Sequence, residues 1–206
     1  MRLLIFGLLV FSLEALSSFF TNRTRTVYRP EVRKFERDSI LNAKIAYDSV
    51  QSIKNTFGSS FGKKLRLDFE ADYPSVYYTT KTRKEYLRCM VFPGNACCQF
   101  FEVGYLSDIN NVSRKKYPSS FDYFYTNNHI RLGIALKDFF QLIPERLLTK
   151  KTVDEYDVYE LKQGVYNEES FPGLSAYLAR YKFRKGILIA FGFGRNFPNF
   201  NPLIDN

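Results

Sequence analysis

The fold is indicated most clearly by the segment Ala176–Phe193, which reads AYLARYKFRKGILIAFGF. In its first half, aromatic and small apolar residues occupy every second position, namely Tyr177, Ala179, Tyr181 and Phe183. A period of two residues is typical of a strand with one face in the core and the other in water. Arg184-Lys185-Gly186 then offers a tight turn, because glycine adopts positive φ without strain. We therefore predict a hairpin of two strands, 176–183 and 186–193.

Further strands are predicted upstream of this hairpin, where short apolar and aromatic runs are separated by turn residues. These runs cover residues 65–70, 75–80, 86–92, 99–106, 121–126 and 156–161. The connections between most of them are short, which favours an antiparallel meander. The charged segment 108–120 is expected to be a surface loop.

Two other segments have apolar residues at helical spacing. The first is 38–57, in which Asp38 or Ser39 is the expected N-cap. The second is 136–148, where Pro144 should kink or shorten the helix because proline lacks a backbone donor. The sequence thus predicts an α+β fold, with a mainly antiparallel sheet and one N-terminal helix and one central helix packed on it.

Length and composition are those of one globular domain. Of the 206 residues, 45% are hydrophobic and 25% are charged, which excludes a disordered chain. Phe occurs 21 times and Tyr 15 times without any Trp, and such flat side chains favour strands. The formal net charge of +9 favours anionic surroundings, such as an acidic polymer or lipid headgroups.

The first residues have the organisation of a cleavable signal peptide, 1–17. Arg2 precedes a short apolar run, and Ala15 and Ser17 have the small side chains that signal peptidases accept at positions −3 and −1. The apolar run is too short to span a bilayer, which takes about 20 residues. We therefore expect a secreted or periplasmic protein, with no integral membrane span after the leader is removed.

The mature chain is expected to begin near Ser18. Residues 18–37 are polar and contain five arginines, so they are expected to form a basic linker or arm. The remaining residues, 38–206, are expected to form a single α+β domain.

The sequence contains three cysteines, Cys89, Cys97 and Cys98. In an oxidising compartment Cys89 can pair with either of the other two across the turn Pro93-Gly94-Asn95, which leaves one thiol over. The alternative is three buried, reduced cysteines. Zinc would need four ligands, and the single histidine, His129, lies far along the chain, so no metal and no cofactor are expected.

A resemblance to small exported bacterial domains rests on two motifs. Ile130-Arg131-Leu132-Gly133-Ile134 opens the central helix, and the late hairpin 177–193 reads YLARYKFRKGILIAFGF. Over about 124–193 the chain resembles envelope domains of the kind found in the outer-membrane-assembly lipoprotein BamE and the β-lactamase inhibitor proteins. Ala135 stands where such domains usually cap the helix with Ser or Thr. The resemblance implies a binding or scaffolding role in an envelope.

Candidate catalytic groups are few. His129 stands in a turn beside two asparagines, where a solvated imidazole is expected. Asp68, Glu70 and Glu102 lie on predicted strands, so they are the first carboxylates that a hydrolase mechanism would use.

Basic clusters with tyrosines nearby are the candidate binding residues. They are Lys63-Lys64, Lys150-Lys151 and the loop Arg114, Lys115 and Lys116. Such clusters hold polyanions in some proteins, whereas a run of two or three charges is most often a solvated face. Export argues against nucleic acid as the partner.

We therefore expect an exported, non-enzymatic binding or scaffolding protein of the cell envelope. Its partner is expected to be an envelope protein or an anionic polymer. The alternative is an envelope hydrolase that acts on glycan or peptide through carboxylates.

Overall fold

The computed structural model describes residues 37–42, 44–46, 49–66, 74–91, 98–109, 115–165 and 175–194. All of them belong to one compact unit, Phe35–Asn206. The expected signal peptide and all but the last residue of the expected arm lie outside the described residues.

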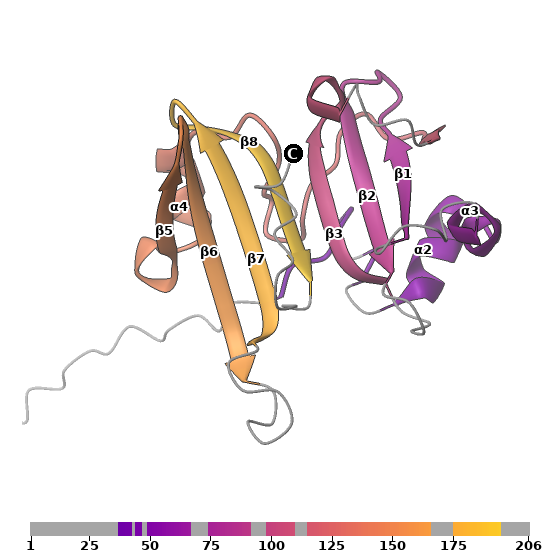
Figure 1. Ribbon diagram of the computed structural model, residues 1–206, viewed down its shortest axis with the longest axis horizontal. Coiled ribbons are helices and arrows are strands. Elements are labelled where there is room, and N and C mark those ends of the chain that lie inside the picture. The colour runs from indigo at the N-terminus through magenta and orange to yellow at the C-terminus, as the bar shows by residue number, and fades with distance from the viewer. Residues whose placement is uncertain are drawn as a thin grey trace, which may run out of the picture. The chain divides into compact units, whose positions relative to one another are not determined.

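An eight-stranded sheet forms the centre of the unit (Figure 1), with the strand order β4-β1-β2-β3-β8-β7-β6-β5. The strands are β1 (Ser75–Thr79), β2 (Glu85–Val91), β3 (Cys98–Tyr105), β4 (Lys116–Pro118), β5 (Thr149–Val153), β6 (Tyr156–Val165), β7 (Ser175–Arg184) and β8 (Ile187–Gly194). Two antiparallel meanders, β1-β2-β3 and β5-β6-β7-β8, meet where β3 pairs with β8. Only β4 runs parallel to its neighbour, β1. The protein is therefore an α+β protein in which the sheet predominates.

The hairpin predicted from the C-terminal alternation is present as β7 and β8. Its turn holds Lys185 at φ 51° and Gly186 at φ 74°. Positive φ at two successive turn positions matches the twist of the flanking strands, and glycine reaches it without steric cost.

In the described part of the chain, three short α-helices accompany the sheet: α2 (Val50–Phe57), α3 (Phe61–Arg66) and α4 (Leu136–Leu142). Figure 1 shows α2 and α3 beside β1, and α4 behind β5 and β6. Among the described residues, none of the helices is long and apolar enough to cross a membrane.

The predicted helix 38–57 is wrong in its first half. Ile40 and Ile45 pair as an isolated bridge around a sharp turn, and both side chains are buried. The spacing of these apolar residues resembles that of a helix because a tight turn, like a helix, can bury residues that lie a few positions apart in sequence. Ser49 caps α2 instead of Asp38 or Ser39, by accepting a hydrogen bond from the backbone N–H of Ser52.

Other boundaries also differ from the sequence predictions. Residues 65 and 66 end α3 and do not begin a strand. In the predicted strand 121–126 only Tyr125 and Thr126 make isolated bridges. The expected surface loop 108–120 contains β4. The central helix α4 ends at Leu142, so it is shorter than the predicted range 136–148, and Pro144, which cannot donate to a helix, lies just beyond it. The rest of that range contains a short 3-10 turn, Glu145–Leu147, and β5, which was not predicted, begins directly after it.

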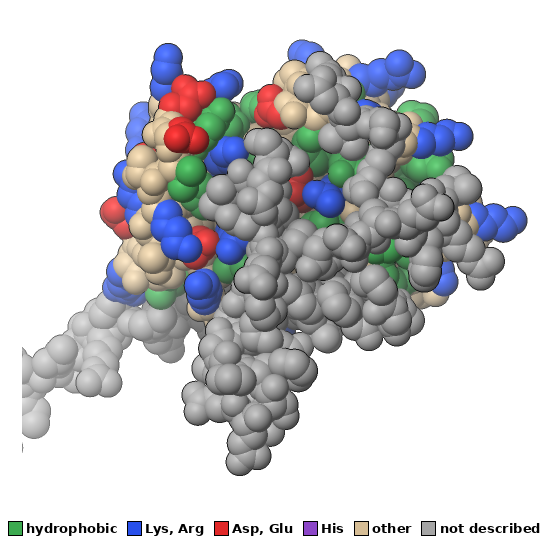
Figure 2. Space-filling model, in the orientation of Figure 1, with side chains coloured by type: hydrophobic (Ala, Val, Ile, Leu, Met, Phe, Trp, Pro, Cys, Tyr) green, Lys and Arg blue, Asp and Glu red, His purple; other side chains and the backbone are tan. Residues whose placement is uncertain are grey.

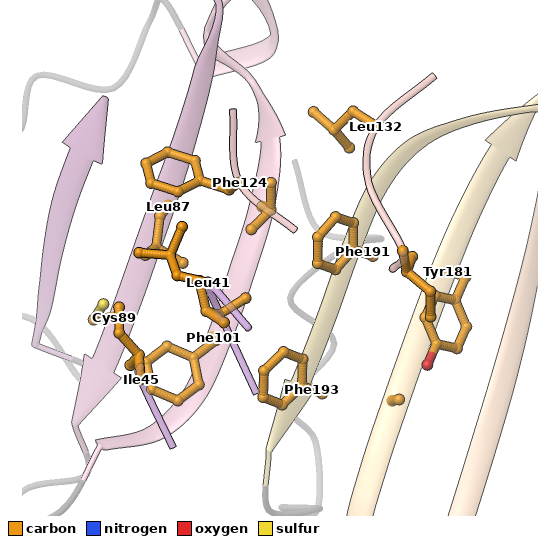
Figure 3. Packing of buried hydrophobic residues seen from close by; sticks show 14 of the residues in the cluster. Leu41, Ile45, Leu87, Cys89, Phe101, Phe124, Leu132, Tyr181, Phe191 and Phe193 are labelled. Carbon is orange, nitrogen blue, oxygen red and sulfur yellow. The ribbon is translucent and has the colours of Figure 1, made fainter. Parts of the chain in front are cut away.

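One face of the sheet holds the main core, part of which Figure 3 shows. Phe101 of β3 and Phe193 of β8 lie with ring centroids 5.5 Å apart, so the junction of the two meanders is packed by aromatic rings. The buried phenylalanines of this core are Phe61, Phe101, Phe124, Phe139, Phe183, Phe191 and Phe193. Their size explains why so aromatic a sequence suits this sheet, since each ring buries a large apolar surface.

The opposite face of the sheet does not simply face water, which corrects the expectation from alternation. Leu178 and Arg180 of β7 are buried there. The guanidinium of Arg180 has a carboxylate partner there, because its Nε lies 2.9 Å from Oε1 of Glu160. Two glycines leave room for aromatic rings on this face. A Cβ at Gly104 would meet the ring of Tyr86 at 2.7 Å, and a Cβ at Gly192 would meet the ring of Phe100 at 2.6 Å.

Candidate functional site

The basic residues predicted to bind a ligand lie partly at one edge of the sheet. Arg114 lies outside the described residues. Lys115 is exposed and directly precedes the edge strand β4, and Lys116 begins that strand. Lys63 and Lys64 lie on α3, so the fold brings together two basic clusters that are far apart in sequence.

The two clusters meet over a pair of tyrosines. Nζ of Lys64 lies 4.4 Å from the ring centroid of Tyr117 and 5.0 Å from that of Tyr78. Nζ of Lys115 lies 5.3 Å from the Tyr117 ring. We call Lys64, Lys115, Tyr78 and Tyr117 the basic–aromatic cluster. A ring face attracts a cation within about 6 Å, so the tyrosines hold both lysines at this edge.

The tyrosines are themselves fixed by packing. Tyr78 lies on the central part of β1 and is buried, and the ring of Phe57 from α2 stacks on it at 3.8 Å between centroids. Tyr117 lies on β4, with its ring centroid 6.3 Å from that of Tyr78. Three members of the cluster, Lys64, Tyr78 and Tyr117, therefore lie in a helix or a strand, and Lys115 directly precedes β4.

Two like charges, those of Lys64 and Lys115, are concentrated here. Partial burial lowers the pKa of Lys64, and the nearby charge of Lys115 lowers it further. Within the described part of the chain, neither lysine has a carboxylate within ion-pair distance. An anion placed between them would relieve this repulsion.

In the third basic cluster, Lys150-Lys151, both lysines have a carboxylate partner. Lys150 lies 3.0 Å from Asp157, and Lys151 lies 3.2 Å from Glu160. Figure 2 shows this difference as a mixture of blue and red side chains over β5 and β6, and blue without red along the edge where α2 and α3 lie. The paired lysines of β5 suit the protection of a sheet edge against pairing with another chain.

Of the predicted hydrolase carboxylates, only Glu102 lies among the described residues. Glu102 is buried on β3, where the hydroxyl of Tyr86 donates to its Oε1 and Nη1 of Arg88 lies 3.8 Å from its Oε2. Burial raises the pKa of Glu102, and Arg88 opposes that rise. Asp68 and Glu70 lie outside the described residues.

The cysteines leave the disulfide prediction open. Cys89 is buried in the main core, and its Cα partner on β3 is Phe101. Cys98 is the partner of Val91, so Cys89 and Cys98 are not directly opposite each other. A disulfide requires Cα atoms about 4.4–6.8 Å apart, which favours directly opposite positions. Cys97 lies outside the described residues.

A cleft of about 840 Å³ lies beside the start of β2 and of α4, and it was missed in the sequence. Glu85, Tyr123, His129, Arg131 and Asp138 are among the residues that line it. The sequence feature that could have indicated this cleft is the polar and aromatic run at residues 121–131, which reads FDYFYTNNHIR. His129 is exposed in a turn, as expected.

A buried carboxylate, Asp38, forms a second feature that the sequence did not reveal. Its Oδ2 accepts hydrogen bonds from the hydroxyls of Tyr177 and Tyr181 at 2.7 and 2.8 Å. Its Oδ1 accepts one from Nδ2 of Asn128 at 2.9 Å. Both carboxylate oxygens have hydrogen-bond partners, so the network joins the N-terminal segment to β7.

Metal binding finds no support in the described ranges, which contain no group of three His, Cys, Asp or Glu side chains suited to hold an ion. In the comparisons with known proteins, no family model, no curated protein and no solved structure matches the chain.

Proposed function

We propose that the protein is an exported, non-enzymatic binding protein of the cell envelope, and that its basic–aromatic cluster binds an anionic polymer. The observation that carries this proposal is the approach of Lys64 and Lys115 to one ring, that of Tyr117, without a carboxylate partner among the described residues. Holding two like charges together costs free energy unless a ligand compensates them.

An extended ligand suits the position of the cluster better than a small ion. The cluster stands at the outer edge strand of the sheet, and the neighbouring Lys63 is exposed. A chain of phosphate or carboxylate groups can contact several such lysines in turn. Each lysine near an anionic surface contributes about 1 kcal/mol to binding.

Edge protection is the competing explanation, because lysine and proline on an edge strand discourage pairing with another chain. That explanation suits Lys116 and Pro118, which lie on β4 itself. It does not account for Lys64, which lies on α3 and reaches the same tyrosine.

Envelope hydrolysis through carboxylates receives less support. Glu102, the described member of the predicted set, is buried and engaged by Tyr86. The export and envelope parts of the proposal rest on the N-terminal sequence and on the resemblance to small envelope domains.

The test is a binding titration of the full-length chain with inorganic polyphosphate and, in parallel, with polygalacturonate. The double variant Lys64→Gln/Lys115→Gln should raise the Kd by about 30-fold, because each lysine contributes about 1 kcal/mol to the free energy of binding. The matched control is Lys137→Gln/Lys185→Gln, two exposed lysines with the same total charge change. The control should change Kd by less than about threefold, because salt screens distant charges.

Equal weakening by the two double variants would contradict the proposal, since it would reduce the binding to nonspecific attraction by net charge. Binding of neither polymer by the wild-type chain would contradict it as well.

A further inference from the structure

We propose that the cleft beside β2 and α4 binds a short neutral saccharide. This site is separate from the basic–aromatic cluster, and it does not depend on the function proposed above. Its volume of about 840 Å³ lies within the range of about 300–1,000 Å³ that is usual for small-molecule sites.

The loop that builds the cleft is held in place by backbone hydrogen bonds. Tyr125 pairs with Arg131, and between them the backbone N–H of His129 donates to the carbonyl of Thr126 at 2.9 Å. Further along, Gly133 donates to Leu188 of β8 at 2.9 Å. The loop is thus closed on itself around His129 and tied to β8 after Arg131, and before it the backbone N–H of Phe124 donates to Glu85 of β2. The cleft is therefore formed before a ligand arrives, which lowers the entropic cost of binding.

An aromatic side chain stands exposed in the wall of this cleft. Tyr123 is 46% exposed, and it is one of only two large hydrophobic residues that are exposed in the described part of the chain. Its ring lies 5.4 Å from that of Tyr125, which also lines the cleft. The planes of the two rings are inclined by 48°, so the rings form an angled aromatic wall. Within this wall, the exposed ring of Tyr123 is the platform on which the C–H face of a sugar ring can stack.

The polar groups of the cleft include both hydrogen-bond acceptors and donors. Glu85 is half-buried, and its Oε2 accepts the backbone N–H of Phe124 at 2.8 Å, which fixes the carboxylate. Asp138 and Arg131 are exposed on other parts of the lining. Burial raises the pKa of Glu85, while the Phe124 hydrogen bond and the Arg131 charge lower it.

This mixture fits hydroxyl groups better than it fits an ion. The two carboxylates, Glu85 and Asp138, would repel an anion. The guanidinium of Arg131 already lies 5.7 Å from the ring centroid of Tyr123, so it would repel a cation at that ring. A sugar hydroxyl both donates and accepts, so it can bond to carboxylate and guanidinium alike, while the ring stacks on tyrosine.

The test is an isothermal titration of the full-length chain with cellotetraose, maltotetraose and the tetramer of N-acetylglucosamine. At least one should bind with a Kd below about 1 mM. Tyr123→Ala should weaken that binding by at least about tenfold, whereas Tyr123→Phe, which keeps the platform, should restore it to within about threefold. Tyr123 is exposed, so its replacement leaves the core intact.

The matched control is Tyr156→Ala, which removes a tyrosine of β6 that lies away from this cleft, under Lys182. It should leave saccharide affinity unchanged. No binding of any of the three saccharides, or equal weakening by Tyr123→Ala and Tyr156→Ala, would overturn the proposal. Tighter binding of tetramethylammonium than of the saccharides, lost in Glu85→Gln, would also overturn it, because it would make the cleft a cation site.

Discussion

Replacing Asp38 by alanine tests whether the buried network stabilises the fold. The variant removes the acceptor of two buried tyrosine hydroxyls, those of Tyr177 and Tyr181. Each buried donor that loses its partner lowers the free energy of unfolding by about 1–3 kcal/mol, so two such donors lower it by about 2–6 kcal/mol. Removal of a desolvated carboxylate offsets part of this cost. We expect a net loss of about 2–4 kcal/mol, out of about 5–15 kcal/mol for a typical domain.

The assay is urea unfolding at neutral pH, followed by far-UV circular dichroism and by tyrosine fluorescence, since the chain has no Trp. Asp122→Ala is the matched control, because Asp122 is exposed. Asp38→Asn keeps one acceptor oxygen, so it should lose less stability than the alanine variant. A loss below about 0.5 kcal/mol for Asp38→Ala would refute the role of these hydrogen bonds in stability.

The same residue predicts a pH dependence. Burial is the largest influence on Asp38 and raises its folded-state pKa above 3.8, although Asn128, Tyr177 and Tyr181 oppose the rise. The folded chain therefore holds the proton more tightly than the unfolded chain. The resulting stability is fully present below about pH 3.8 and is lost as the pH rises through the folded-state pKa. The stability of the wild type relative to Asp38→Asn should therefore fall as the pH increases, and a rise would contradict this sign.

Three further predictions concern packing, export and the thiols. Gly104→Ala should destabilise by about 1–3 kcal/mol in urea unfolding, because its Cβ would meet the Tyr86 ring at 2.7 Å. Gly62→Ala on α3, where nothing lies within 4 Å, should instead stabilise slightly, and the reverse order would contradict the packing argument. Mass spectrometry of the protein exported by a bacterial host should find Ser18 at the N-terminus, whereas an intact leader would exclude cleavage. Alkylation of the unfolded, unreduced protein should label one cysteine per chain if a disulfide forms, and three if none does.

Local pattern was sufficient wherever an element is stabilised by its own neighbours in sequence. The β7–β8 hairpin was predicted because its alternation and its Lys185-Gly186 turn lie within one short segment. The effect of Pro144, which was expected to kink or shorten the central helix, is also local, since proline acts on its own helix, and α4 ends at Leu142.

Prediction failed where a residue is used by a distant part of the chain. Asp38 has the residue type of a helix cap, but its carboxylate bonds to Tyr177 and Tyr181, which lie on β7. The cleft was missed because its wall comes from Glu85 of β2 and from the loop around Arg131, which are far apart in sequence. The burial of Arg180 was missed because its partner, Glu160, is supplied by the neighbouring strand.

The sequence by itself determined the class of the fold, the late hairpin and the excess of positive charge, because composition and short-range periodicity act locally. Only the tertiary structure decided that Lys64 and Lys115 meet at Tyr117, since that contact requires α3 and β4 to lie side by side at the edge of the sheet. It also decided which positive charges are compensated. Lys150 and Lys151 form ion pairs with Asp157 and Glu160 of β6, whereas the described residues offer Lys64 and Lys115 no such partner. Coulomb interactions depend on distance in space, and sequence separation does not fix that distance.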